Sequence, residues 1–298
     1  MTERAAGPVP GDAARADAEG PAPPGRQRSQ GAVSLRVGVA VPGGASIIRD
    51  LAESGPSRLR FPRRTGPRVE AILVNTAGGI ACGDEVSVDV ALEPGADLVL
   101  TTTAAEKVYR SDGPVSRIAN RLCLGAGARL AWLPQETILY DRARLARRLE
   151  ADLAPDARLL VGEAVLFGRA AHGERVETGL FSDVWRIRRG GRLVYADHLA
   201  LSGPVTERLA RPALGGGARA LATLLDLSPE AESRLAEARA LLEAAGTNSP
   251  GGVEAGASAW NGFLAVRMLA PDADALRRAV AAFWTGYRDE ALPRVWQM

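Results

Sequence analysis

Short runs of alternating apolar residues, each closed by a glycine or proline turn, recur along the first two thirds of this sequence. Apolar residues occupy every second position of residues 33–41, and the run stops at Pro42-Gly43-Gly44. Residues 86–92 repeat the pattern before Pro94-Gly95. A period of two places successive side chains on opposite faces of a strand, and Gly and Pro favour turns. The pattern therefore predicts a body built from many short strands.

The order of these runs also indicates how the strands are arranged. Gly-Ala pairs come directly before two of them, at Gly95-Ala96 and Gly127-Ala128, as expected for successive coils of a strand stack. Arg189-Gly190-Gly191 separates two further runs, 176–187 and 192–201, and predicts a hairpin. The remaining predicted strands cover residues 69–74, 98–103, 115–124, 128–133, 145–153 and 158–167, whereas residues 42–68 are mixed in character.

The last third of the chain has helical patterns. Ser228-Pro229-Glu230 offers a capping hydroxyl, a proline at the first helical position and an acid in the first turn, and Gly246 offers a stop. Asp272 is a second cap, followed by apolar residues at 276, 280, 283 and 287 on one helical face. Between the helices we expect a loop at 246–258 and a strand at 263–269. The predicted fold is therefore mainly β within the α+β class, with two helices packed on a strand body.

Composition limits the class of protein. The 298 residues carry a formal net charge of +2, which is too small to predict a nucleic-acid or membrane-lipid partner. No run approaches the length of about 18 apolar residues that spans a membrane. Residues 1–32 lack the apolar core of a signal peptide and predict a disordered tail, and two cysteines make no disulfide framework. A cytoplasmic location is the simplest expectation.

Most catalytic and metal-binding signatures are absent from the sequence. The two histidines, His172 and His198, form no pair with metal-ligand spacing, and there is no CxxC. There is no P-loop for phosphate and no Gly-x-Ser-x-Gly elbow of a serine hydrolase. We therefore predict no closed, high-affinity metal site and no tightly bound cofactor.

Two neighbouring segments place charged groups among apolar residues. They are residues 101–111 (TTTAAEKVYRS) and 132–141 (WLPQETILYD), and each follows an apolar, strand-like run. Glu106 has Lys107 beside it, whereas Glu136 has no cation nearby before Arg142. Burying a carboxylate is costly unless a partner or a ligand neutralises it. These segments therefore predict a polar site on the β scaffold.

These two segments and several others resemble the urease accessory protein family UreD, also called UreH. The other matching segments, in the same order as in the family, are 75–84 (NTAGGIACGD), 163–174 (EAVLFGRAAHGE), 183–197 (DVWRIRRGGRLVYAD) and 292–296 (LPRVW). The resemblance covers residues 33–298, which we expect to form one UreD-like domain after the tail.

The resemblance implies a function without chemistry of its own. Members of this family are scaffolds or metallochaperones for nickel delivery into apo-urease, with a strand stack that resembles a β-helix. The implied partners are the accessory protein UreF, the GTPase UreG through UreF, and the urease structural subunits. Ni(II) is implied as cargo in transit, bound weakly enough to leave. The positions that match the family's nickel passage are Asp84, Thr102, Glu136, Asp141, Glu163 and Asp183, and the alternative for each is a structural hydrogen bond.

Two residues depart from the usual family pattern and offer further metal ligands. Cys82 stands where the family commonly has glycine, and His172 stands where methionine is usual. Either side chain would add a softer nickel ligand near the neighbouring acids. The alternatives are a small buried thiol at position 82 and a solvent-exposed loop histidine at position 172. Cys123 is expected in the core.

Tryptophan and arginine residues mark candidate interface positions, because both are enriched at the hot spots of protein interfaces. Core packing is an alternative for the tryptophans. The candidates are Trp185, Arg186, Arg294 and Trp296. Arg169 and Glu174 are instead expected to pair with each other across the turn between them.

Two other functions stay open. One is a β-helix enzyme that uses a pair of carboxylates to act on carbohydrate. The other is a purely structural adaptor with no metal in its path. Loss of urease activation on substitution of the acids Glu136 and Glu163, with the complex still assembled, would favour the nickel scaffold over the adaptor.

Overall fold

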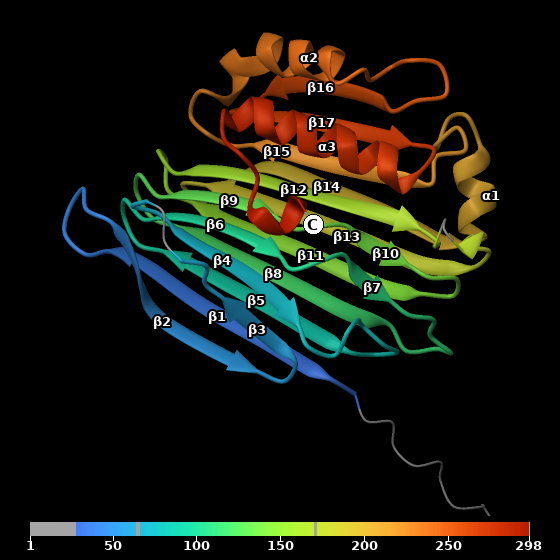
Figure 1. The fold of residues 1–298 in the computed structure, drawn as a ribbon, viewed down its shortest axis with the longest axis horizontal. Helices are drawn as coiled ribbons and strands as arrows, with labels where there is room; N and C mark the ends of the chain where they lie inside the picture. The colour runs from blue at the N-terminus through green and yellow to red at the C-terminus, as the bar shows by residue number, and fades with distance from the viewer. Residues whose placement is uncertain (1–27, 64–65, 170–171, 298) are drawn as a thin grey trace, which may run out of the picture.

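The computed structural model describes residues 28–63, 66–169 and 172–297. These residues form two stacked sheets with helices on one side (Figure 1). Residues 1–27 of the expected tail lie outside the described residues, and the first strand already begins at Gln30. No described helix combines the length and the apolar composition that a membrane span requires.

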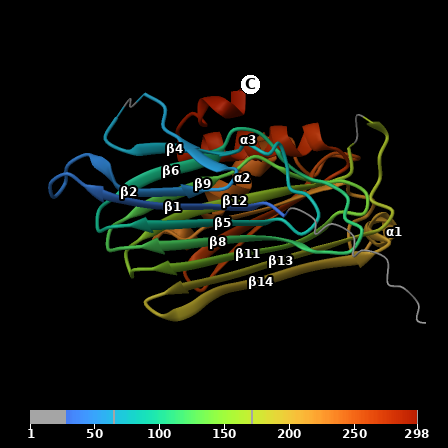
Figure 2. The same cartoon turned by 90° about the horizontal axis from the view of Figure 1, so that it is seen from below.

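One sheet has seven strands in the order β14-β13-β11-β8-β5-β1-β2. Figure 2 shows β1, β5, β8, β11, β13 and β14 following one another in this order. The bounds of its strands are β1 (Gln30–Val39), β2 (Ser46–Ser54), β5 (Glu85–Leu92), β8 (Ser116–Leu124), β11 (Arg144–Leu153), β13 (Gly179–Arg189) and β14 (Arg192–Gly203).

The second sheet has ten strands, eight of them in the order β16-β17-β15-β12-β9-β6-β4-β3. The short strands β10 and β7 continue from β12 at one end of the sheet. The bounds are β3 (Ser57–Arg60), β4 (Val69–Asn75), β6 (Asp97–Thr102), β7 (Glu106–Val108), β9 (Arg129–Leu133), β10 (Thr137–Leu139), β12 (Arg158–Phe167), β15 (Ala220–Asp226), β16 (Glu254–Trp260) and β17 (Phe263–Ala270).

The chain passes back and forth between the two sheets, and successive passes stack in parallel. Strands β5, β8, β11 and β13 pair in parallel in one sheet, and β4, β6, β9 and β12 do so in the other. The predicted strand stack is therefore confirmed. Its coils meet at a corner where Ala96, Ala128 and Ala157 have no exposed surface, so the Gly-Ala pairs do mark successive coils.

Two apolar layers hold the molecule together. The first lies between the sheets and contains Leu35, Val90 and Leu149 from one sheet and Leu98 and Leu159 from the other. Most strands that contribute to it match the predicted ranges within one residue. The hairpin of β13 and β14 also has its predicted turn, where Gly190 and Gly191 adopt φ values of 54° and 78° that favour glycine.

The second apolar layer lies between the ten-stranded sheet and the helices (Figure 1). Helix α3 (Ala273–Arg288) is capped by Asp272 as predicted, because its carboxylate accepts from Ala275 N at 2.8 Å. Its predicted apolar face is buried. The other helical segments are α1 (Val205–Ala210), η2 (Ala231–Arg234), α2 (Leu235–Ala244) and η3 (Arg294–Gln297).

Several sequence expectations were wrong. The helix predicted from Ser228 begins as the 3-10 turn η2 at Ala231, and the Ser228 hydroxyl makes no hydrogen bond within the described chain. Residues 254–258, expected as a loop, belong to β16, where small residues conceal the strand pattern. Cys123 is exposed, because the alternation of β8 points Leu122 and Leu124 inward instead. The mixed segment 42–68 contains β2 and β3, whose apolar residues do not alternate clearly.

Candidate functional site

A buried arginine joins the two sheets at the centre of the candidate site. Arg147 of β11 holds Asp183 of β13 with two hydrogen bonds, Nε to Oδ1 at 3.1 Å and Nη2 to Oδ2 at 2.6 Å. Its Nη1 lies 2.5 Å from Oε2 of Glu163, in β12 of the opposite sheet. The same Nη1 donates to Thr137 Oγ1 at 3.2 Å. All four side chains are buried, so the cluster is a polar layer inside the apolar core.

The charges of this cluster depend on one another. Trp132 Nε1 donates to the second Glu163 oxygen at 3.0 Å, so both oxygens of that carboxylate have a partner. Burial raises the pKa of the Glu163 carboxyl, and the charge of Arg147 opposes this effect. Burial alone would lower the pKa of the Arg147 guanidinium, but the charges of Asp183 and Glu163 raise it. The arginine therefore stays charged and compensates one of the two carboxylates.

A half-buried carboxylate, Glu106, lies beside this cluster without an arginine. Glu106 of β7 is the register neighbour of Thr137, and parallel register neighbours point to the same face of a sheet. Asn75 Nδ2 donates to the two Glu106 oxygens at 3.1 and 3.2 Å. Desolvation raises the pKa of the Glu106 carboxyl to about 6, although the Asn75 hydrogen bonds lower it. Within the described part of the chain no cation forms an ion pair with Glu106, and Lys107 is exposed.

The side chains described so far form a connected set, which we call the inter-sheet row. It consists of Asn75, Glu106, Thr137, Arg147, Glu163 and Asp183. Its members lie next to one another from the end of β4 to the middle of β13. Every member has a polar partner, and among the described residues only the charge of Glu106 has no opposite charge bonded to it.

Glu136 lies apart from the inter-sheet row, beneath α3. Its carboxylate accepts from Arg277 Nη1 at 3.2 and 3.1 Å, and Arg277 Nη1 also donates to Gln135 Oε1 at 3.0 Å. Arg277 Nη2 donates to the backbone oxygen of Trp296 at 3.1 Å. The cation missing near Glu136 in the sequence is thus supplied by a helix far along the chain.

The other three passage candidates each close a turn or a strand end. Asp84 accepts from the backbone nitrogens of Ser29 and Ala81, both at 2.8 Å. Thr102 Oγ1 accepts from Gln135 N at 2.9 Å and donates to Ala104 O at 3.1 Å. Asp141 accepts from Thr178 N at 3.1 Å. Of the six candidates, the structure brings together only Glu163 and Asp183, through Arg147.

The candidate soft ligands do not join these acids. Cys82 Sγ lies 3.1 Å from Ser111 Oγ and 3.0 Å from Asp112 Oδ1, in a half-buried turn. His172 is exposed. Among the described residues, no three side chains of the His, Cys, Asp and Glu types are grouped closely enough to hold a metal ion.

The interface candidates differ in how a partner could reach them. Trp185 is 2 % exposed and packs edge-on against Tyr195 in the core. Trp296 is 8 % exposed, and its Nε1 donates to Thr101 Oγ1 at 3.1 Å and to Leu133 O at 3.2 Å. Arg186 is half-buried and Arg294 is exposed. Only the two arginines therefore offer surface to a partner in this conformation.

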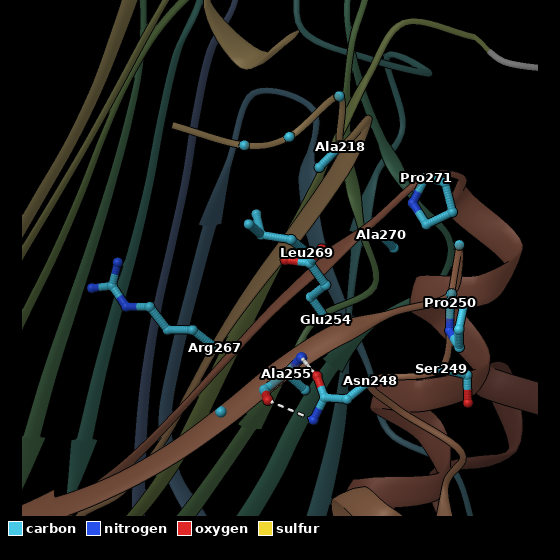
Figure 3. Close-up of a pocket in the computed structure, with 16 residues that line it drawn as sticks. Ala218, Asn248, Ser249, Pro250, Glu254, Ala255, Arg267, Leu269, Ala270 and Pro271 are labelled. Carbon is cyan, nitrogen blue, oxygen red and sulfur yellow. Dashed lines mark hydrogen bonds between the residues drawn. The ribbon is translucent and has the colours of Figure 1, made fainter. Parts of the chain in front are cut away.

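A hollow of about 670 Å³ opens between the loop before β15 and the loop before β16 (Figure 3). Six of its sixteen lining residues are glycines, and the charged ones are Glu254 and Arg267. The Asn248 side chain is held by Ala255, with hydrogen bonds of 3.1 and 2.8 Å, and Arg267 pairs with Asp197 at 2.5 Å. None of the predicted site residues lines this hollow, and its few charged groups do not suggest a reaction.

Sequence reasoning missed Arg147 and placed Glu106 with the wrong partner. The alternation of β11 contained a signal for Arg147. Every second residue of this strand points inward, and Arg147 occupies one of these positions. The other inward residues are Leu145, Leu149, Ala151 and Leu153. A charged residue in the apolar phase of a strand predicts a buried ion pair.

Comparison with known proteins identifies relatives along nearly the whole chain. The sequence model described as UreD urease accessory protein matches residues 29–297. Urease accessory protein UreD 1 of Methylobacterium radiotolerans is 67% identical over 276 residues, which cover 93% of this chain and 94% of that protein. Urease accessory protein UreD 2 of Methylorubrum populi is 63% identical over 285 residues, 94% of each chain. Urease accessory protein UreD of Azorhizobium caulinodans is 54% identical over 275 residues, 92% of this chain and 98% of that protein.

Proposed function

Because this chain belongs to the UreD family of urease accessory proteins, we propose that it serves urease maturation as a non-enzymatic scaffold that passes Ni(II) towards apo-urease. The observation that supports the nickel role is the inter-sheet row. It places the buried carboxylates of Glu163 and Asp183 and the half-buried Glu106 in one polar layer between two sheets that are otherwise packed with apolar side chains. Such a layer is costly to bury, which favours a functional role over simple packing.

The charge balance of the inter-sheet row suits transient binding. A cluster of unpaired acids would trap a divalent cation, whereas an ion in transit must bind weakly enough to leave. Arg147 already holds Glu163 and Asp183, so Ni(II) has to displace the guanidinium to bind there. The returning guanidinium then releases the ion. Glu106 has no such competitor among the described residues and is ionised above a pKa of about 6, which suits it for first contact with the cation.

The partners are part of the same proposal. UreF, the GTPase UreG through UreF, and the urease structural subunits are the proteins that a scaffold of this family would bring together, in the cytoplasm. Arg186 and Arg294 are the two interface candidates with accessible side chains. Nickel is cargo in this account, and no resident cofactor is needed.

The carbohydrate enzyme has less support in the geometry. A glycosidase needs two carboxyl groups facing a sugar across an open cleft. Glu163 and Asp183 instead share one arginine and are 5 % and 8 % exposed. Glu136 lies on the other side of the ten-stranded sheet, under α3 and bonded to Arg277.

Deleting the gene in cells that carry the urease genes, and then restoring it, tests the proposed function. We expect urease purified from the deletion strain to be inactive and poor in nickel, and restoration to recover both activity and nickel content. Total cellular nickel serves as the control for uptake. Full activity with normal nickel content in the deletion strain would contradict the proposal.

A further inference from the structure

Beyond the ends of three adjacent strands lies a hollow that the nickel proposal does not use. Strands β7, β10 and β12 are neighbours in register, and they end at Val108, Leu139 and Phe167. The segments that follow them turn outward and enclose about 520 Å³. The hollow is lined by Tyr109, Arg110, Tyr140, Asp141, Arg142, Arg169 and Glu174, and all of these except Arg142 belong to segments that carry the resemblance described above.

The floor of this hollow is a fixed stack of aromatic and arginine side chains. The rings of Tyr109 and Tyr140 meet edge to face with centroids 5.1 Å apart. The Arg169 guanidinium lies over the Tyr140 ring, 4.3 Å from its centroid. Glu174 holds Arg169 with bonds of 2.8 and 2.9 Å, which confirms the predicted pair. These bonds hold the pKa of the Glu174 carboxyl below its usual value, so Glu174 is ionised. Its negative charge cancels the positive charge of Arg169.

Two other arginines line this hollow, and few acidic groups balance their positive charges. The Arg142 side chain is 69% exposed, and its nearest acid, Asp141, lies 3.7 Å from its Nε. One Asp141 oxygen already accepts from the backbone of Thr178. Arg110 is exposed, and the described residues give its side chain no hydrogen bond or ion pair. The hollow therefore presents two guanidinium groups to an incoming anion.

The backbone at Arg142 is held in an unusual conformation. Its φ of 62° is left-handed, a region that costs a non-glycine residue about 1 kcal/mol. Hydrogen bonds from Arg142 N to Thr178 O at 2.8 Å and from Ser111 N to Arg142 O at 2.9 Å fix it there. Glycine would fit this position without strain, so an Arg142→Gly substitution removes the charge and relieves the backbone together.

We propose that this hollow docks a glutamate- or aspartate-rich segment of a partner protein, a proposal that rests on the scaffold function above. Arginine recognises the planar carboxylate group with two parallel bonds, and Arg110 and Arg142 are the two available guanidinium groups. Tyr109 is 37% exposed and offers apolar surface beside them.

The shape of the surface favours an extended peptide over a small free anion. A second hollow of about 540 Å³ shares Tyr140 and Arg169 with the first and continues to Ile138 and Leu166. Lys107 lines it together with the acids Asp272 and Asp274, so this hollow adds apolar surface rather than positive charge. A single anion needs only the first hollow, whereas a chain occupies both when its acidic side chains meet Arg110 and Arg142 and its apolar side chains lie along Ile138 and Leu166.

Binding of a capped peptide of six glutamates, labelled with fluorescein and followed by fluorescence anisotropy, tests the proposal on the full chain. The test variant combines Arg110→Gln with Arg142→Gly, which removes both charges and relieves the backbone at position 142. The control is Arg148→Gln, because Arg148 is 62% exposed and lies on a strand of the seven-stranded sheet, away from the hollow. We expect about a tenfold or greater loss of affinity in the test variant, and unchanged affinity in the control.

Three results would overturn the docking site. They are no binding to the wild-type chain, equal binding to the double variant, and tighter binding of inorganic phosphate than of the peptide at the same arginines. The gene deletion separates this inference from the proposed function. Normal nickel loading without the gene would remove the maturation role, while arginine-dependent peptide binding would still stand. If urease loses nickel in the deletion strain but the peptide binds the double variant as well as the wild-type chain, only the docking site is ruled out.

Discussion

Arg147 and Glu163 approach from opposite sheets and meet between them, with Nη1 2.5 Å from Oε2. Both residues occupy positions that their strands otherwise fill with inward-pointing apolar side chains. The pair therefore interrupts the apolar layer at one point and joins the two walls of the strand stack there. Asp183 completes the arrangement from the sheet of Arg147.

Removing the arginine should cost far more than removing an ordinary surface arginine. Arg147→Met leaves Glu163 and Asp183 buried without an opposite charge, and we expect the free energy of unfolding to fall by about 3–5 kcal/mol. Arg148→Met, at an exposed neighbour paired with Glu150, should change it by about 0.5 kcal/mol at most. Urea unfolding at neutral pH measures both. Equal effects of the two substitutions would show that the buried pair is not what stabilises this layer.

Glu106 makes stability depend on pH in a defined direction. Its folded pKa of about 6 exceeds the ordinary value of 4.5, so the folded state favours the protonated carboxyl. Stability is therefore lost as the pH rises from about 4.5 to about 6, by about 2 kcal/mol in all. Glu106→Gln removes this loss, because an amide does not ionise.

Urea unfolding of wild type and Glu106→Gln at several pH values checks this prediction. The variant should gain stability relative to wild type between pH 4.5 and pH 7, and the gain should level off above the folded pKa. A difference that stays constant across this range would mean that Glu106 does not titrate in the folded protein as described.

The C-terminal segment should contribute to stability through Trp296. Trp296→Phe removes the indole N–H that is shared by Thr101 Oγ1 and Leu133 O, and it leaves a small cavity. We expect a loss of about 1–2 kcal/mol in the free energy of unfolding. Trp260→Phe is the matched control, because Trp260 is 52% exposed, and it should have little effect. If the control is as destabilising as the test, the contacts of Trp296 are not the cause.

Local patterns in the sequence predicted most of the strand body. Period-two alternation defined β5, β8 and β11 because each of these strands packs one face on a continuous apolar layer. The same rule failed for β2, where most residues are exposed and no face is consistently apolar. The rule also failed for Cys123. A shift of one position in the alternation moves a side chain to the other face of the sheet, and Cys123 lies on the exposed face while Leu122 and Leu124 point inward.

The site could be predicted only in part, because its partners are far apart along the chain. Glu136 looked unpaired until Arg277 supplied its cation from α3. The sequence pointed to both Glu163 and Asp183 as site residues but not to Arg147, which joins them. Only the inward position of Arg147 in its alternating strand indicated that it would be buried. Pairing between elements is set by how the coils stack, and no short sequence window contains that information.

The nickel content of urease matured with Glu106→Gln or Glu163→Gln shows whether the inter-sheet row passes the ion. Glu106→Gln should leave the fold intact or more stable, so a failure of delivery cannot be blamed on unfolding. Urease would be purified from cells in which each variant replaces the wild-type chain, with recovery of the accessory complex checked in parallel. We expect nickel-poor, inactive urease alongside an assembled complex for both variants. Wild-type nickel content with both variants would contradict it and would favour a structural adaptor with no metal in its path.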